Sequence, residues 1–576
     1  MEENPHVIEN WTVENFKSIK YASFDLTSLN ILVGTNSSGK SSLIQSLLFA
    51  SQSVTQNDIT LNGPLLALGK ASETLHHNEN EAKFTAAVRI DNKEDGDLYH
   101  MSYTFHSPDG LDLALKEICV SKGKSNVFRA STENIKNKTD LDYIKAEFGG
   151  SPVEILHVKI AGPAKPLSRT YIVLRGLNPV GIYRHSDENV HRKLLKANYP
   201  YELLKSDSEA LTELYFSLRY RLDESDYFPF TNDGPKGLQG DELVRETMDE
   251  LSKITRPTPP RKELSRQLYD QIIKALTGMQ VRKAWIDYPM YQFEGPDYTR
   301  RRYQLLGGWP YAPYLPEEEE SFRAFAACAS AVVNTLRSVR YLGPLRDQPR
   351  VVHNEYNVSV PNLPTGRRGE GSAQLLHNYG KREIAYRDPE GHLRNETLSQ
   401  SITTWIDYLG IAEGIRTIDQ GKLGRGLEID LGQHKRDLTA VGVGASQLLP
   451  IVISFLQASP GSVYIVEQPE LHLHPAVQAR LADFFLIAKP DVRAIIETHS
   501  EYLVTRTRRR IAEEIATPDS TGIYFVDQEN GSSRYERISV NSYGDLGSWP
   551  RGFFDEQEKD LTAILLASAK RRKRLG

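Results

Sequence analysis

The octapeptide Gly34–Ser41 (GTNSSGKS) constrains the fold of this chain more than any other feature, because it has the spacing of a phosphate-binding loop. The apolar run Asn30–Val33 before it predicts a buried strand, and Ser41–Ala50 after it has the apolar spacing of a helix. Backbone N–H groups of a glycine turn between a strand and a helix can surround a phosphate, and the helix dipole adds to the attraction. The sequence therefore predicts an α/β fold with a phosphate site at this turn.

Individual residues of this loop are predicted to bind ATP and Mg²⁺. We expect the Lys40 ammonium group to contact the β- and γ-phosphates and the Ser41 hydroxyl to be a Mg²⁺ ligand. The other residues expected to contact the nucleotide are Asn36, Ser37, Ser38, Gly39 and Ser42. A chance match to the loop pattern is the alternative, and the strand and helix that flank the loop argue against it. Ahead of the loop, Asn15–Ile19 with Phe24 and Leu26 predicts a pair of strands.

A second glycine-rich segment, Val441–Gln447 (VGVGASQ), lies near the other end of the chain, just before a predicted helix. Small residues let the backbone come close to a γ-phosphate. Gly444, Ser446 and Gln447 are therefore expected to bind a nucleotide that another subunit carries. An ordinary glycine turn is the alternative, and the position of the segment shortly before the next motif favours nucleotide binding.

The next motif begins with Val463–Val466, a short apolar run that predicts a central parallel strand. Glu467 at its end would present a carboxylate at the carboxyl edge of the sheet, where we expect it to hold Mg²⁺ directly or through water. Gln468 follows, and a glutamine can orient an attacking water but cannot accept its proton. Glu470 is the nearest carboxylate that could take over this role.

A further apolar strand is predicted over Arg493–Ile496, and Glu497–Ser500 (ETHS) follows it. His499 is expected to contact the γ-phosphate or the attacking water. A histidine with a purely structural role is the alternative. The predicted catalytic residues are therefore Glu467, Gln468, Glu470 and His499.

His472 and His474 lie between these motifs, and neighbouring histidines and carboxylates are the usual ingredients of a zinc site. Their spacing is not one of the usual ligand patterns, and Cys119 and Cys328 lie far away in the sequence. Over metal binding we favour a loop at His474 and Pro475 that crosses the interface between two subunits.

The order of these motifs resembles that of ABC-type ATPase heads, and Gln468–Pro475 (QPELHLHP) closely resembles the EEPExHLHP segment of OLD-like ATPases. With Leu61–Gly69, Tyr341–Arg350 and Leu546–Glu556, the motifs resemble OLD-like AAA family ATPases of the DUF3696 kind. ATPase subunits of the Septu and PARIS anti-phage systems are similar in organisation. The resemblance implies a head like those of RecF, Rad50 and OLD proteins, whose two half-sites close when two copies meet. The sequence departs from this family at Gln468, where a glutamate is usual.

The resemblance covers roughly residues 1–75 and 340–560, and together with the sequence patterns between them it predicts a division of the chain into three parts. Residues 1–180 would form an N-terminal ATPase lobe with the phosphate loop and a β-rich segment, and residues 181–340 a mainly helical insertion. Residues 341–576 would form a C-terminal ATPase lobe with the signature, Walker B, D-loop and switch histidine. The insertion sustains no heptad pattern, which argues against a long coiled-coil arm. Its segment Tyr288–Tyr314 mixes aromatic residues with arginines; we favour a packed loop there over nucleic-acid binding or protein docking.

Composition predicts a cytoplasmic protein. The chain has only two cysteines, too few for a disulfide framework, and no apolar run long enough to span a membrane. Its net charge of −5 argues against a surface that coats DNA uniformly, although local basic patches can still occur.

The resemblance implies an ATPase that acts as a homodimer or a higher even-numbered homo-oligomer, and Gln468 implies slow hydrolysis. We expect the sensor and regulatory subunit of a bacterial anti-phage defence complex, which controls a separately encoded nuclease or toxin effector. Nucleic acid or a phage protein is the expected trigger. The sequence shows no nuclease motif of its own. A RecF- or Rad50-like DNA-repair ATPase that binds DNA directly is the alternative, and a nucleotide-locked scaffold is a third possibility.

Overall fold

Two compact units make up the chain in the computed structural model. Unit 1 comprises Met1–Leu98, Ser102–Ala114 and Ser330–Gly576, and unit 2 comprises Tyr99–Met101 and Leu115–Ala329. The structure describes residues 6–77, 79–90, 97–133, 138–149, 151–160, 168–186, 196, 201–202, 264–277, 316–348, 362–419, 421, 424–432, 434–547 and 556–575. Most of the expected helical insertion, including Tyr288–Tyr314, lies outside these residues.

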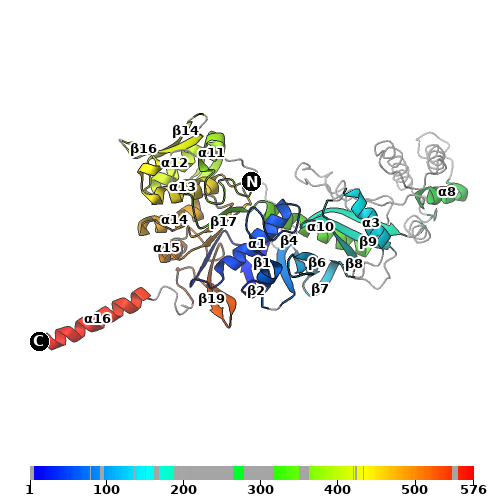
Figure 1. The fold of residues 1–576 in the computed structure, drawn as a ribbon, viewed down its shortest axis with the longest axis horizontal. Coiled ribbons are helices and arrows are strands. Elements are labelled where there is room, and N and C mark those ends of the chain that lie inside the picture. Colours follow the sequence, from blue (N-terminus) through cyan, green and yellow to red (C-terminus); the bar gives the residue numbers. More distant parts are fainter. Residues whose placement is uncertain are drawn as a thin grey trace. The chain divides into compact units, whose positions relative to one another are not determined.

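A six-stranded sheet in the order β11-β17-β18-β3-β19-β20 forms the centre of unit 1. Figure 1 labels two of its strands, β17 and β19. All neighbours are parallel except β20, which pairs antiparallel with β19. The strands are β3 (Leu29–Gly34), β11 (Arg340–Leu342), β17 (Val463–Glu467), β18 (Arg493–Glu497), β19 (Thr521–Glu529) and β20 (Ser532–Ile538). Every residue of β17 is buried, as in a parallel strand covered on both faces, which explains its continuous apolar sequence.

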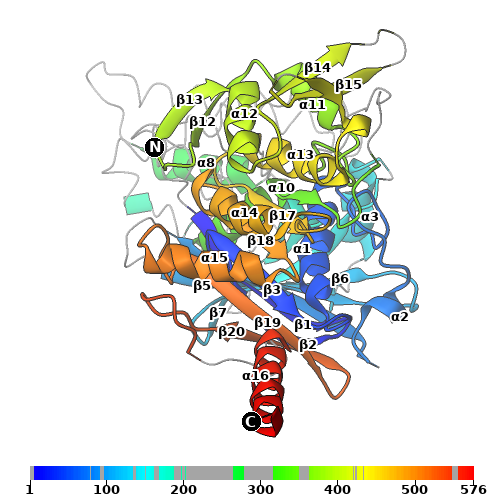
Figure 2. The same ribbon diagram turned by 90° about the vertical axis from the view of Figure 1, so that its left-hand side faces the viewer.

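Helices follow the central strands directly along the chain. Helix α1 (Lys40–Thr55) follows β3, α14 (Pro475–Ile487) follows β17 and α15 (Glu501–Ala512) follows β18, and Figure 2 shows α14 and α15 next to each other. Helix α13 (Val443–Leu456) precedes β17. One buried hydrophobic cluster joins β3, β17 and β18 with α12 (Leu398–Tyr408), α13 and α14. The helices next to the late motifs therefore pack against the central sheet.

An antiparallel sheet lies against α1 in the same unit. It contains β1 (His6–Phe16), β2 (Ile19–Asp25) and β4 (Glu81–Ile90), with β1 paired to both others. The Trp11 indole N–H donates to Ser46 Oγ of α1 at 3.0 Å, and Phe49 of α1 packs edge-on against Phe84 of β4. These contacts fix α1 between two sheets.

Unit 1 also contains the short helix α2 (Ala71–Thr74) and several elements later in the chain. They are α11 (Ser372–Tyr379), β12 (Glu383–Arg387), β13 (Leu393–Thr397), α12 (Leu398–Tyr408), β14 (Gly414–Asp419), β15 (Arg425–Asp430), β16 (Lys435–Asp437), the 3₁₀ turn η2 (Leu438–Ala440) and α16 (Glu556–Leu575).

Unit 2 contains a series of antiparallel strands that pair with their neighbours in the sequence. They are β6 (Ala114–Lys122), β7 (Ser125–Ser131), β8 (Glu154–Ile160), β9 (Ser168–Arg175) and β10 (Asn178–Ser186), accompanied by α3 (Lys138–Glu147) and α8 (Arg266–Thr277). Strand β5 (Asp97–His106) and helix α10 (Pro316–Arg337) have residues in both units. None of the helices in the described ranges combines the length and apolar character needed to cross a bilayer.

Candidate functional site

The phosphate loop joins β3 to α1, so the predicted order of strand, turn and helix is confirmed. Two glycines fit where a side chain would not. A Cβ atom on Gly34, whose φ is +147°, would lie 2.0 Å from the carbonyl oxygen of Val526 in β19. A Cβ atom on Gly39, whose φ is +101°, would lie 1.9 Å from Ser533 Oγ in β20. The loop is therefore packed tightly against the hairpin β19–β20.

A cavity of about 240 Å³ opens at the N-terminus of α1. The described residues that line it are Lys17, Ser18, Ser37, Ser38, Gly39, Lys40, Ser41, Ser42, Gln45 and Glu497. The structure thus places the predicted residues Ser37–Ser42 around one cavity, whereas Asn36 is not among the lining residues. Lys17, Ser18, Gln45 and Glu497 were not predicted to belong to the site.

Two lysine side chains face this cavity. Lys40 is 3% exposed, and its Nζ donates to the carbonyl oxygens of Gly34 at 3.1 Å and Thr35 at 2.7 Å. Burial lowers the pKa of Lys40, and the charges of Glu497 and Glu470 act in the opposite direction. Lys17 lies in the turn between β1 and β2, and its Nζ donates to Gln45 Oε1 at 2.8 Å. Both ammonium groups are available to a polyanion at the α1 N-terminus.

Two glutamates end neighbouring strands at the carboxyl edge of the sheet. Glu467 of β17 is in register with Glu497 of β18, the strand that lies between β17 and β3. Ser41 Oγ donates to Glu497 Oε2 at 2.9 Å, whereas the Tyr341 hydroxyl donates to Glu467 Oε1 at 2.6 Å. Burial raises the pKa of both carboxyls; that of Glu497 reaches about 7, with a further contribution from the charge of Glu467.

The other predicted catalytic residues lie beside these two strands. Gln468 has a φ of +47°, in the left-handed region that residues other than glycine seldom adopt, and its N–H donates to the Glu497 carbonyl oxygen at 2.7 Å. The His499 backbone N–H donates to Glu470 Oε1 at 2.6 Å. Partial burial and then the charge of Lys40 lower the pKa of His499 below its usual 6.5, so its ring is neutral at pH 7. Glu467, Gln468, Glu470 and His499 therefore meet at one edge of the sheet.

The two histidines of the Gln468–Pro475 segment, His472 and His474, have different surroundings. His474 is the N-cap of α14, where its Nδ1 accepts from the Ala476 backbone N–H at 3.3 Å. His472 is exposed and has a φ of +60°. The capping contact gives His474 a role in starting α14, and the predicted position of His474 at a subunit interface stays a prediction.

The glycine-rich segment Val441–Gln447 does not line the cavity. Gly442 is the N-cap of α13, and Val443 beside it is 49% exposed. Ser446 Oγ donates to the Val443 carbonyl oxygen at 2.7 Å. None of the predicted residues Gly444, Ser446 and Gln447 is among the described residues that line the cavity. A single chain therefore does not bring the two sets of predicted nucleotide contacts together.

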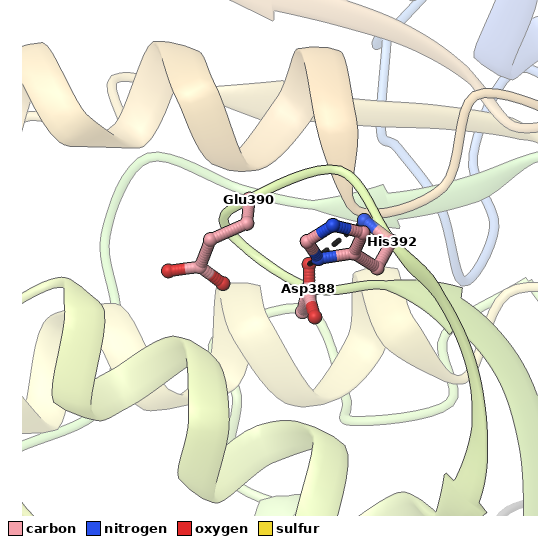
Figure 3. A group of neighbouring side chains, drawn as sticks. All are labelled: Asp388, Glu390 and His392. Atoms are coloured by element: carbon pink, nitrogen blue, oxygen red, sulfur yellow. Dashed lines mark hydrogen bonds and ion pairs between the residues drawn. The ribbon is translucent and has the colours of Figure 1, made fainter.

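A group with metal-ligand chemistry also occurs in the turn between β12 and β13, where Asp388, Glu390 and His392 lie close together (Figure 3). Asp388 Oδ2 accepts from Arg394 Nε at 2.8 Å, and Oδ1 accepts from the His392 backbone N–H at 2.8 Å. Glu390 and His392 are exposed. Both Asp388 oxygens thus have protein partners that stabilise the hairpin, and we assign the group no metal.

Family models match most of the chain. Residues 7–277 match "AAA ATPase domain", residues 315–505 match "AAA domain, putative AbiEii toxin, Type IV TA system", and residues 517–564 match "Protein of unknown function (DUF3696)". The chain contains AAA ATPase domains. The predicted AAA and DUF3696 resemblance is thereby confirmed. No curated protein matches this ATPase.

Solved structures similar to the ATPase include SMC head domains. The Smc head domain of Pyrococcus furiosus with an extended coiled coil, bound to the C-terminal domain of ScpA, is 12% identical with a TM-score of 0.35. That comparison covers 97% of this chain and 99% of the other. The SMC head domain from Thermotoga maritima is 10% identical with a TM-score of 0.32, covering 93% of this chain and 100% of the other.

The α/β fold class predicted from the sequence is confirmed by the mainly parallel central sheet and the helices that follow its strands. The ABC-type head stays a prediction. Strand β3, which precedes the phosphate loop, and the strands β17 and β18, which end at Glu467 and Glu497, are parallel neighbours in one sheet, and an antiparallel sheet packs on α1. Lys17, Ser18 and Gln45 had no local signal, whereas Glu497 ends a short apolar strand, the same signal that pointed to Glu467. Lys17 and Glu497 enter the site because β1, β2 and β18 lie next to the loop in space.

Proposed function

We propose that this ATPase binds ATP with Mg²⁺ in the cavity at the α1 N-terminus and hydrolyses it slowly. The observation that carries the proposal is the convergence of Lys40, Ser41 and a buried carboxylate edge on one cavity. A cavity of about 240 Å³ is smaller than the roughly 300 Å³ at which small-molecule sites usually begin. It therefore suits the phosphates, with the rest of the nucleotide bound by another surface.

The chain would bind the phosphates through charge and backbone. Lys40 lies at the first position of α1, where backbone N–H groups and the helix dipole favour an anion. Its ammonium group now donates to two loop carbonyls and would exchange these for phosphate oxygens. Lys17 would add a second positive charge from the β1–β2 turn.

The donor atoms beside the cavity fit Mg²⁺, which prefers oxygen ligands. Ser41 Oγ, the Glu467 carboxylate and the Glu497 carboxylate are all oxygen donors at one sheet edge. The ion would supply positive charge that stabilises the phosphate oxygens during transfer. Ser41 and Glu467 are the residues that we propose from the sequence as its ligands.

Gln468, Glu470 and His499 would orient the attacking water. A neutral His499 ring can accept or donate a hydrogen bond, depending on its tautomer. Glu470 Oε2 is buried and has no hydrogen-bond partner among the described residues, so it remains available as an acceptor. Because Gln468 cannot accept a proton, hydrolysis would depend on Glu470 or on the phosphate itself.

A second copy would complete the site. Gly444, Ser446 and Gln447 lie in the first turn of α13, away from the cavity of their own chain. Ser446 and Gln447 are buried, whereas Gly442 and Val443 before them are exposed. A helix N-terminus with small residues suits close approach to a phosphate on a partner. We therefore propose a homodimer or a higher even-numbered homo-oligomer with ATP between the copies.

The biological role that we propose is that of a cytoplasmic sensor and regulator in bacterial anti-phage defence. The resemblance to ATPase subunits of the Septu and PARIS systems supports this role, and the match to a family described as a putative toxin of a type IV toxin–antitoxin system is compatible with it. The ATPase would control a separately encoded nuclease or toxin effector, with nucleic acid or a phage protein as trigger.

The decisive experiment is a binding measurement with matched lysine variants. Lys40→Ala should weaken ATP binding at least about tenfold in isothermal titration calorimetry, because a hydrogen bond from a charged group contributes roughly 1.5–3 kcal/mol. Lys381→Ala, which removes an exposed lysine of the same unit, is the control and should bind like the wild type. Unchanged ATP affinity in Lys40→Ala would refute the site.

A further inference from the structure

Glu497 is closer to the phosphate loop than Glu467 in the order of the sheet. It is the last residue of β18, and it pairs on one side with Glu467 of β17 and on the other with Leu32 of β3. The strand that carries the phosphate loop therefore has Glu497, and not Glu467, as its immediate acidic neighbour. Both carboxylates lie at the same level of the sheet edge.

The hydrogen bonds of the two glutamates also indicate that Glu497, rather than Glu467, lies at the phosphate loop. Glu497 Oε2 accepts from the Ser41 hydroxyl at 2.9 Å and lines the cavity. Glu467 Oε1 accepts from the Tyr341 hydroxyl at 2.6 Å, and Glu467 is not among the described lining residues. The hydroxyl expected to bind Mg²⁺ thus has Glu497 as its carboxylate partner.

The charges around Glu497 favour the binding of a cation. Its side chain is 5% exposed, and the negative charges of Glu467 and Glu470 both act on it. Lys40 is the positive group that acts on it in return, and the phosphates would engage the same ammonium group. Buried carboxylates that repel one another are stabilised when a divalent cation lies among them.

We propose that Glu497 is a metal-site residue, whose carboxylate holds the Mg²⁺ ion of the nucleotide together with the Ser41 hydroxyl. Glu467 supports the ion from the neighbouring strand. This inference rests on the nucleotide site proposed above and assigns it a ligand in addition to Ser41 and Glu467. It also gives the first residue of the ETHS segment a role distinct from that of His499.

The test measures how strongly a metal ion improves nucleotide binding, without any turnover. The affinity for the non-hydrolysable analogue AMP-PNP is determined by calorimetry in EDTA and again with Mn²⁺, and the ratio of the two dissociation constants is the metal enhancement. Glu497→Gln should lower this enhancement at least tenfold and leave the affinity in EDTA equal to or tighter than that of the wild type. Glu467→Gln should lower the enhancement less. The exposed Glu536→Gln is the control and should keep it unchanged.

A Glu497→Gln enhancement within twofold of the wild type overturns the inference, as does a loss confined to Glu467→Gln. A wild-type protein that binds no AMP-PNP under either condition instead refutes the proposed nucleotide site. If Glu497→Gln does not fold, Glu497→Asp decides the question in the same titration. A reduced enhancement supports the metal role, and a wild-type enhancement overturns it.

Discussion

Asp483 offers the clearest test of how the fold holds the site together. This residue of α14 has no exposed surface, and its carboxylate has three partners. Arg506 Nη1 donates to Oδ2 at 2.7 Å and Arg510 Nε to Oδ1 at 2.6 Å, both from α15. The Tyr408 hydroxyl at the end of α12 donates to Oδ2 at 2.5 Å. Because α14 begins after His474 and α15 after Ser500, one carboxylate connects the helices that follow two site segments.

Asp483→Ala should destabilise unit 1 by about 3–5 kcal/mol, the usual cost of leaving a buried charge without its partner. The side chains of Arg506 and Arg510 are only 21% and 16% exposed, so water compensates each guanidinium group only in part. Arg510→Ala should cost less, roughly 1.5–3 kcal/mol, because Asp483 keeps Arg506 and Tyr408. Asp483→Ala should cost more stability than Arg510→Ala, because it removes the carboxylate from two guanidinium groups, whereas Arg510→Ala leaves Asp483 with two partners.

Urea unfolding followed by tryptophan fluorescence measures both losses, since Trp405 packs edge-on against Phe484 of α14 with ring centroids 5.1 Å apart. Asp519→Ala, which removes an exposed aspartate between α15 and β19, is the control and should change the free energy of unfolding by less than about 0.5 kcal/mol. An Asp483→Ala protein within about 1 kcal/mol of the wild type would show that the cluster does not hold α14 to α15.

Three further predictions concern the site itself. Gln468→Glu should speed single-turnover hydrolysis and Glu470→Gln should slow it, each by up to the roughly 10²- to 10⁴-fold that general-base assistance provides; a wild-type rate typical of cycling ATPases, or normal hydrolysis by Glu470→Gln, would contradict this account. A mixture of Lys40→Ala and Ser446→Arg proteins should regain ATP turnover that neither has alone, because each mixed dimer keeps one intact composite site; no turnover in dimers shown to form would leave the trans arrangement without support. Gly34→Ala should abolish ATP binding in calorimetry, since its Cβ would lie 2.0 Å from the Val526 carbonyl oxygen, and a variant with wild-type affinity would mean that the loop tolerates displacement.

The elements of the site that the sequence predicts correctly depend on local patterns. The strand before Gly34 and the helix after Gly39 follow from apolar periodicity, and the strands that end at Glu467 and Glu497 follow from short continuous apolar runs. Each signal lies within a few residues of the element that it predicts. Local pattern was therefore sufficient for the phosphate loop and for the late motifs.

The residues that sequence reasoning missed depend on contacts between distant segments. Glu497 meets Ser41 across 456 positions of the chain, and this contact requires the strand order β17-β18-β3. The hairpin β19–β20 supports the loop, because Ser533 Oγ donates to the Ser38 carbonyl oxygen at 2.6 Å. Neither the strand order nor this support leaves a periodic trace in the sequence.

The link between Gln468 and Glu497 limits what the Gln468→Glu variant can gain. The Gln468 N–H donates to the carbonyl oxygen of Glu497, and Gln468 directly follows Glu467 in the sequence. A glutamate at position 468 would therefore add a carboxylate on a residue next to Glu467 and Glu497. Repulsion between that carboxylate and Glu497 would make the binding of a cation at Glu497 more favourable. We therefore expect the rate gain of Gln468→Glu to depend on Mg²⁺ concentration, with the full gain at saturating Mg²⁺ and a smaller one when Mg²⁺ is limiting. A gain that is independent of Mg²⁺ would show that position 468 and the metal site act separately.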